Sequence, residues 1–162
     1  MRNLATLLAI GTMLATPYFF STPVFAGGDL SKQDPIEIRV DMGKDGVDEH
    51  RFYPDKFTFE TGKLYKLVIH NPSDSKHYFT SLGFAAKVWT RKVQVMDDLG
   101  PGAKQIGEIK GAVREVEVYP GGTTEWWFVP VATGTAKVGC GIKEKDGETH
   151  LEKGMDGVIT II

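Results

Sequence analysis

Three residues near the end of the chain combine donor types that suit copper. Cys140 is the only cysteine, and His150 and Met155 follow it within sixteen residues. A thiolate, an imidazole and a soft thioether together suit copper that cycles between Cu(I) and Cu(II) better than other common metals. A second histidine is needed to complete the equatorial ligands of such a site.

A lone thiol also has other interpretations. Cys140 could be an inert residue of the core, could form a disulfide between molecules, or could be a metal ligand. Methionine is not a usual zinc ligand, which argues against structural zinc. A catalytic pair of Cys140 with His150 or His77 is conceivable, but it gives no role to Met155. A binuclear copper site of the cytochrome-oxidase type needs two cysteines and is excluded.

Short alternating segments separated by Gly and Pro turns predict an all-β chain of about eight strands. Strands at this spacing are typical of a sandwich or barrel. Trp126 and Trp127 occupy successive strand positions, so they face opposite sides of a sheet and one of them fills the core. The predicted strands cover residues 35–41, 56–60, 64–70, 77–80, 113–118, 124–129, 135–138 and 158–162.

Residues 82–110 do not follow this pattern. The segment Phe84-Ala-Ala-Lys-Val-Trp89 could form one or two helical turns, and a Gly- and Pro-containing loop follows at residues 97–102. We therefore expect a long, partly helical connection that crosses from one sheet to the other. Long connections of this kind often carry function or lie over a site.

The first 26 residues are typical of an export signal. Arg2 precedes a mostly apolar run from Leu4 to Leu14, and Val24-Phe25-Ala26 predicts cleavage after Ala26. An uncleaved membrane anchor is the alternative, although the run is short for a span. Residues 27–162 then form one domain in the periplasm or another exported location, with no membrane span.

The chain has 19 basic and 21 acidic residues, and this near-neutral balance gives no indication of nucleic acid as a partner.

The C-terminal part of the chain resembles the cupredoxins, the blue copper proteins. His150-x-x-x-Gly154-Met155-x-Gly157 resembles the end of the ligand loop in plastocyanin-like members. Residues 133–140 resemble the strand that leads to their ligand cysteine, and residues 119–129 resemble a paired strand after a Pro-Gly turn. His77 follows an Asn71-containing turn, as the first ligand histidine does in that family.

The resemblance implies a cupredoxin-like Greek-key β-sandwich that holds one copper ion. The implied ligands are His77, Cys140, His150 and Met155. The implied function is that of an exported, monomeric electron carrier, which is not an enzyme and which exchanges single electrons with redox partners. One alternative is a copper-binding module for delivery, sensing or tolerance, whose partners are copper-handling proteins. Another is a domain without metal that serves protein contact.

Two features depart from the family pattern. Nine residues separate Cys140 from His150, which resembles the long loop of copper nitrite reductases. The charged residues 143–148 of this loop would crowd the apolar patch through which small carriers meet their partners. Tyr78 stands where many members have an Asn that ties the ligand loops together. This change suggests a more tetragonal, green site.

The remaining histidines are given ordinary roles by their positions. We expect His50 to be a solvated loop residue and His70 to be a packed or edge residue of its strand. The cluster Lys143-Glu-Lys-Asp146 is interpreted as a solvated loop tip.

Overall fold

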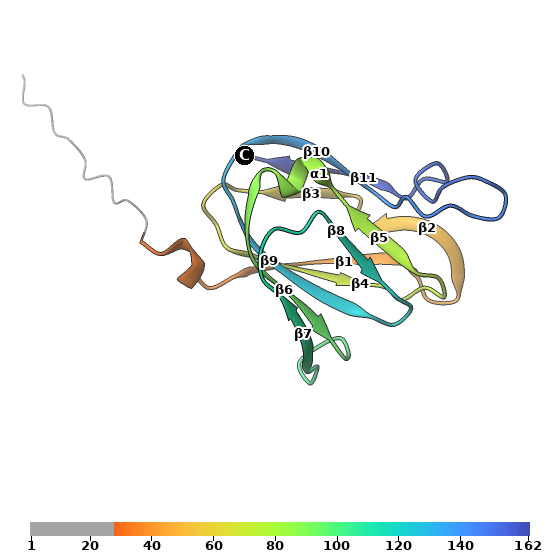
Figure 1. Ribbon diagram of the computed structural model, residues 1–162, viewed down its shortest axis with the longest axis horizontal. Coiled ribbons are helices and arrows are strands. Elements are labelled where there is room, and N and C mark those ends of the chain that lie inside the picture. Colours follow the sequence, from red (N-terminus) through yellow and green to blue (C-terminus); the bar gives the residue numbers. More distant parts are fainter. Residues whose placement is uncertain (1–27) are drawn as a thin grey trace, which may run out of the picture.

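The computed structural model describes residues 28–162, so the predicted export signal lies outside the described residues. Two sheets form a sandwich (Figure 1). The first sheet has the order β2 (Val47–Tyr53), β1 (Ile36–Lys44), β4 (Tyr65–His70), β9 (Thr123–Pro130), β6 (Val88–Met96) and β7 (Gln105–Ile109). The second has the order β3 (Lys56–Phe59), β11 (Asp156–Ile161), β10 (Gly134–Gly139), β5 (His77–Thr80) and β8 (Glu115–Val118).

The predicted all-β sandwich is confirmed. Each of the eight predicted strands is present, as β1, β3, β4, β5, β8, β9, β10 and β11. Most neighbouring strands are antiparallel, while β1 runs parallel to β4 and β3 runs parallel to β11. The β3–β11 pair joins segments that are about a hundred residues apart, so the N-terminal and C-terminal parts of the described chain belong to the same sandwich.

The segment at residues 82–110 is more ordered than the sequence suggested. A small helix is present, but it shares only Phe84 and Ala85 with the predicted segment, because Val88 and Trp89 begin β6. This helix, α1, covers Leu82–Ala85, and the Ser81 hydroxyl oxygen accepts a hydrogen bond from the Phe84 backbone N–H at its start. Most of the rest is not a connection. It forms β6 and β7, an antiparallel pair at the edge of the first sheet. A short 3₁₀ helix (Leu30–Lys32) precedes β1.

Aromatic rings fill the space between the sheets. Phe84 projects from α1 into this core, and its ring centroid lies 4.9 Å from Phe128 and 5.3 Å from Trp126. Phe59 of the opposite sheet meets Phe128 edge to face at 5.1 Å. Trp126 is fully buried, whereas the Trp127 ring lies on the other face of the sheet beside Lys92. One tryptophan therefore fills the core, as the alternation predicts.

Several strand ends meet at one end of the sandwich. His77 is the first residue of β5, Cys140 directly follows β10, and the segment 140–155 joins β10 to β11. This segment lies at the same end of the molecule as β2 (Figure 1). The two sheets thus bring residues far apart in the sequence to a common site. Among residues 28–162, no helix is long and apolar enough to cross a membrane.

Candidate metal centre

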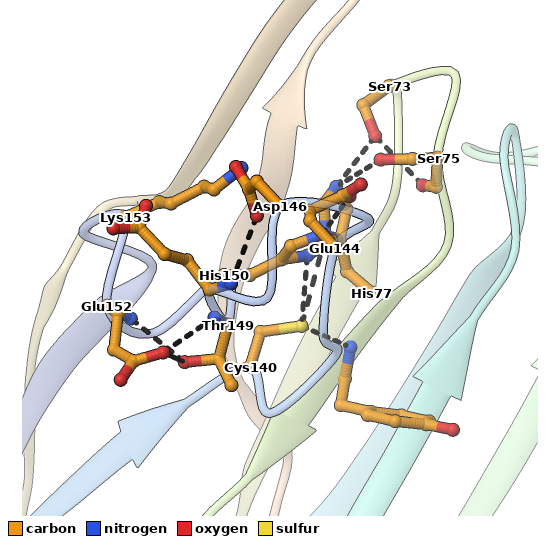
Figure 2. Close-up of polar contacts among 12 residues, drawn as sticks. Ser73, Ser75, His77, Cys140, Glu144, Asp146, Thr149, His150, Glu152 and Lys153 are labelled. Carbon is orange, nitrogen blue, oxygen red and sulfur yellow. Dashed lines mark hydrogen bonds and ion pairs between the residues drawn. The ribbon is translucent and has the colours of Figure 1, made fainter.

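Three of the four predicted donors converge on one point. The Nδ1 atoms of His77 and His150 are 3.1 Å apart. The Cys140 Sγ lies 3.4 Å from Nδ1 of His150 and 4.0 Å from Nδ1 of His77. Figure 2 shows both rings directed toward the sulfur. Two imidazole nitrogens and one sulfur at these separations form a trigonal donor set of the kind that electron-transfer copper sites use.

Hydrogen bonds to Ser73 set the proton position on His77. The Ser73 hydroxyl donates to Asn71 Oδ1 at 2.7 Å and lies 2.9 Å from His77 Nε2. Because a hydroxyl has one proton, we assign Ser73 as the acceptor toward the ring, so that Nε2 carries hydrogen. The Asn71 side chain is fixed in turn by donation to the backbone carbonyl of Val118 at 2.8 Å. Nδ1 of His77 is left with its lone pair facing Cys140, as metal binding requires.

Glu144 has the same effect on His150. Its carboxylate oxygen lies 2.7 Å from His150 Nε2, where it accepts the ring proton. This hydrogen bond lowers the pKa of the Glu144 carboxyl from its ordinary value. The bond again leaves Nδ1 as the free donor, and it orients the ring. Both outer nitrogens are therefore anchored, and both inner nitrogens face the sulfur.

Cys140 lies in a site that excludes water. Its side chain is 0% exposed, and burial raises the pKa of the thiol, while backbone N–H groups of Tyr78 and Ile142 act in the opposite direction. The Tyr78 N–H donates to Cys140 Sγ at 3.2 Å. This bond ties β5 to the segment after β10, which is the kind of tie that the missing Asn would supply. A cation bound beside the sulfur would favour the thiolate.

Met155 is placed by the backbone next to Cys140. Its carbonyl accepts a hydrogen bond from the Cys140 N–H at 3.1 Å. The Met155 side chain is 0% exposed and belongs to the same buried cluster as Cys140. Gly154 precedes it with a φ of +102°, a conformation that residues with a Cβ rarely adopt.

The long segment between Cys140 and His150 is an ordered hairpin. Lys143 pairs with Thr149 across it, and the Glu144 N–H donates to the Glu148 carbonyl at 2.8 Å. Its base is closed where the His150 N–H donates to the Ile142 carbonyl at 2.8 Å. The hairpin carries Glu144 to the outer edge of His150.

The predicted solvated tip at residues 143–146 is therefore only partly correct. Asp146 forms an ion pair with Lys153 at 2.6 Å, and Figure 2 shows this pair beside the turn that carries His150. Exposed ion pairs contribute little to stability. Glu144, in contrast, contacts a predicted metal ligand. The charged residue Glu144 near the tip therefore contacts the site directly.

His50 was assigned wrongly by the sequence. It is a residue of β2, not of a loop, and it is only partly exposed. Its ring stacks on His150 with a centroid separation of 3.9 Å and an interplanar angle of 19°. One donor atom from each of His50, His77 and His150 lies within 4.8 Å of the others. The sequence did offer a signal: Asp45-Gly46 between two polar–apolar segments is a hairpin turn, and it would have placed His50 on a strand.

His70 lies outside this cluster of donors. Its Nδ1 contacts the Gly122 carbonyl at 3.1 Å and the Thr123 hydroxyl at 2.9 Å. It is the last residue of β4 and is partly buried. The structure thus gives it the packed, strand-end position that the sequence predicted.

Comparison with known proteins identifies the fold. No protein-family model and no curated protein matches the sequence. Among solved structures, a multicopper oxidase from Campylobacter jejuni matches 86% of this chain and 32% of its own, with a TM-score of 0.58 and 16% identity. A laccase from Pediococcus acidilactici matches 94% of this chain and 31% of its own, with a TM-score of 0.52 and 14% identity. An auracyanin from Roseiflexus castenholzii matches 78% of this chain and 96% of its own, at a lower TM-score of 0.45 and 18% identity.

The chain has a cupredoxin-like fold, as the resemblance implied. It spans about a third of the length of the two oxidases. At this low sequence identity the similarity establishes the fold, and the chemistry must come from the donors themselves. The side chains of His77, Cys140, His150 and Met155 fit a single type 1 copper site.

Proposed function

We propose that this protein is an exported, monomeric, mononuclear copper protein that carries single electrons between redox partners. Its copper ligands are His77, Cys140, His150 and Met155. The observation that carries the proposal is the convergence of both histidine Nδ1 atoms on the buried Cys140 sulfur. Copper bound there would supply a one-electron couple between Cu(I) and Cu(II).

The residues around the donors suit this task. Ser73 and Glu144 hold the two rings through their outer nitrogens, and the Tyr78 N–H holds the sulfur. Rigid supports of this kind keep one geometry in both oxidation states, which limits the reorganisation that accompanies electron transfer. The proposed protein makes or breaks no covalent bond of a substrate, and it is therefore not an enzyme.

A copper-handling role, in delivery, sensing or tolerance, is the second candidate. One observation favours it: the charged hairpin at residues 143–149 lies over His150, where a small electron carrier would present an apolar surface. The two functions share the same ligands and differ in what happens to the metal. A carrier retains copper in both oxidation states, whereas a delivery protein releases Cu(I).

Copper titration of residues 27–162, followed by visible spectroscopy, tests the site. We expect one equivalent of copper to bind and to give an intense charge-transfer band from the Cys140 thiolate. Cys140→Ser should abolish the band, and Ser81→Ala, which changes another buried residue, should leave it. Colour that survives in Cys140→Ser would show that the ligands are misassigned.

The two candidate functions are separated by exchange measurements. For a carrier we expect rapid electron self-exchange between Cu(I) and Cu(II) forms and slow loss of Cu(I) to a chelator. Ready release of Cu(I) together with slow self-exchange would instead support copper delivery.

A further inference from the structure

The proposed ligands are all hidden from solvent. His77, Cys140 and Met155 are 0% exposed, and His150 is 1% exposed. The outer Nε2 of His150 is bonded to Glu144. A partner protein therefore cannot touch a ligand ring directly. An electron from the partner has to pass through another residue to reach the ligands.

His50 is the group that covers the face of His150. Within the three-histidine cluster of the described chain, His50 alone is partly exposed. Its ring is 3.9 Å from the His150 ring, centroid to centroid, and the two planes are nearly parallel at 19°. His50 lies on the same face of β2 as the buried Phe52, so this contact joins a partly exposed residue to a buried donor.

The ring geometry distinguishes stacking from metal binding. Imidazoles that bind one ion through in-plane lone pairs point at it from different directions, so their rings diverge. His77 and His150 have this relation, with centroids 5.0 Å apart and planes at 61°. His50 and His150 lie face to face, so the arrangement places His50 outside the coordination sphere.

We infer that His50 is the contact through which electrons enter and leave the copper site. This inference rests on the proposed electron-carrier function. A reduced one-electron protein would dock against the exposed part of His50 and lose one electron. That electron would pass through the His50–His150 stack, and copper held by the four proposed ligands would take it up as Cu(II) becomes Cu(I), with no bond made and no proton moved. His50 is thus a residue of the docking surface and acts through His150.

Electron self-exchange of the copper-loaded protein tests this role. Self-exchange has no driving force, so a change in reduction potential does not change the equilibrium of the reaction. We expect His50→Ala to slow it by about tenfold, which corresponds to 1.36 kcal/mol in activation free energy. His50→Phe, which restores a flat ring but offers no donor nitrogen, should recover most of the rate. NMR line broadening in mixtures of the Cu(I) and Cu(II) forms gives this rate.

Two controls keep the outcome specific. Tyr119 is 59% exposed and its ring lies beside Lys76, so Tyr119→Ala removes an exposed ring that stacks on no proposed ligand and should have a smaller effect. In protein loaded with ¹¹³Cd and labelled with ¹⁵N-histidine, we expect scalar coupling of cadmium to His77 and His150 only.

Contrary results are clear. An unchanged or faster rate in His50→Ala would overturn the inference, and so would cadmium coupling to His50, which would make it a ligand. If the wild-type protein binds copper but exchanges electrons slowly, the electron-carrier function itself fails. Rapid exchange in both the wild type and His50→Ala would contradict only the role of His50.

Discussion

At the scale of single residues, neighbouring side chains determine which ring nitrogen of His77 and of His150 is available to a metal. An imidazole has two nitrogens, and only a hydrogen bond at one of them decides which is available to a metal. Ser73 makes that choice for His77, and Glu144 makes it for His150. Neither neighbour stands out in the sequence, because serine and glutamate are common on surfaces. Ser73 is only four residues from His77 and Glu144 only six from His150, but both contacts depend on how the intervening turn or hairpin folds.

Ser73 should therefore affect copper binding more than its size suggests. Ser73→Ala removes the nearer of two hydroxyl oxygens at His77 Nε2, at 2.9 Å, and leaves Ser75 at 3.3 Å. We expect copper affinity to fall about 10- to 100-fold. Competition with a chelator of known affinity measures the change. Ser81→Ala is the matched control, since Ser81 is also buried and its hydroxyl donates to the Lys137 carbonyl at 2.7 Å. Equal affinities in the two variants would refute this role of Ser73.

The burial of Cys140 predicts low reactivity in the folded protein without added metal. Because the sulfur is 0% exposed, an aromatic disulfide reagent should modify the native thiol much more slowly than the thiol unfolded in urea. Absorbance of the released product follows both reactions. Similar rates in the two conditions would mean that the native thiol is accessible.

At the scale of elements, the two glycines of the C-terminal motif have different roles. Gly154 supplies a positive φ before Met155. Gly157 permits close packing: a Cβ added there would lie 2.5 Å from the Asp55 carbonyl oxygen and 3.1 Å from a methyl group of Val138. The motif is therefore a pattern of backbone requirements around Met155, a proposed ligand, as well as a pattern of donors.

Gly157→Ala should destabilise the protein by about 1–3 kcal/mol, since the backbone of β3 and the adjoining turn must move to admit a methyl group. Urea unfolding of the protein without added metal measures the change in the free energy of unfolding. Gly102→Ala is the control, because an added Cβ there meets nothing within 4 Å. If both variants unfold at the same urea concentration, the close packing at Gly157 does not limit stability.

Eight strands could be predicted because their alternation is regular, and the three missed strands show where that signal fails. The register of β6 shifts between Thr90 and Lys92 where it pairs with β9, so a bulge breaks the alternation of inward and outward residues. β7 is an edge strand without a buried residue. β2 is rich in charged residues, and missing it caused the wrong assignment of His50.

The convergence of His77, Cys140 and His150 could be predicted because the run from His150 to Gly157 and the Asn71-containing turn before His77 resemble a family pattern. The stack of His50 on His150 could not be predicted in the same way, since it joins β2 to the segment 140–155 across about a hundred residues. Contacts of this kind depend on how the two sheets meet. Residue types and local spacing do not indicate how the two sheets pack against each other.

At the scale of the whole molecule, the site draws on both sheets. His50 comes from the first sheet, His77 belongs to the second, and the segment 140–155 joins β10 and β11 of the second. A metal ion that binds only the folded arrangement stabilises the entire sandwich by mass action. The geometry of the centre and the stability of the domain are therefore coupled.

Copper should raise the midpoint of thermal unfolding. At a free copper concentration of a hundred times the dissociation constant, the gain is about 2.7 kcal/mol, or on the order of 10 °C for a domain of this size. Calorimetry with and without copper measures the shift. Cys140→Ser should show a much smaller shift, and an equal shift would indicate that copper stabilises the protein at another site.

The position of β11 in its sheet has a consequence for biosynthesis. This strand follows all four proposed ligands in the sequence, yet it lies between β3 and β10 and pairs with both. A chain that has emerged from the ribosome only as far as Met155 already contains every donor but lacks the strand that holds them in place. Copper that reached such a nascent chain would meet loose ligands, so the order of synthesis itself favours loading the metal after the chain has been completed.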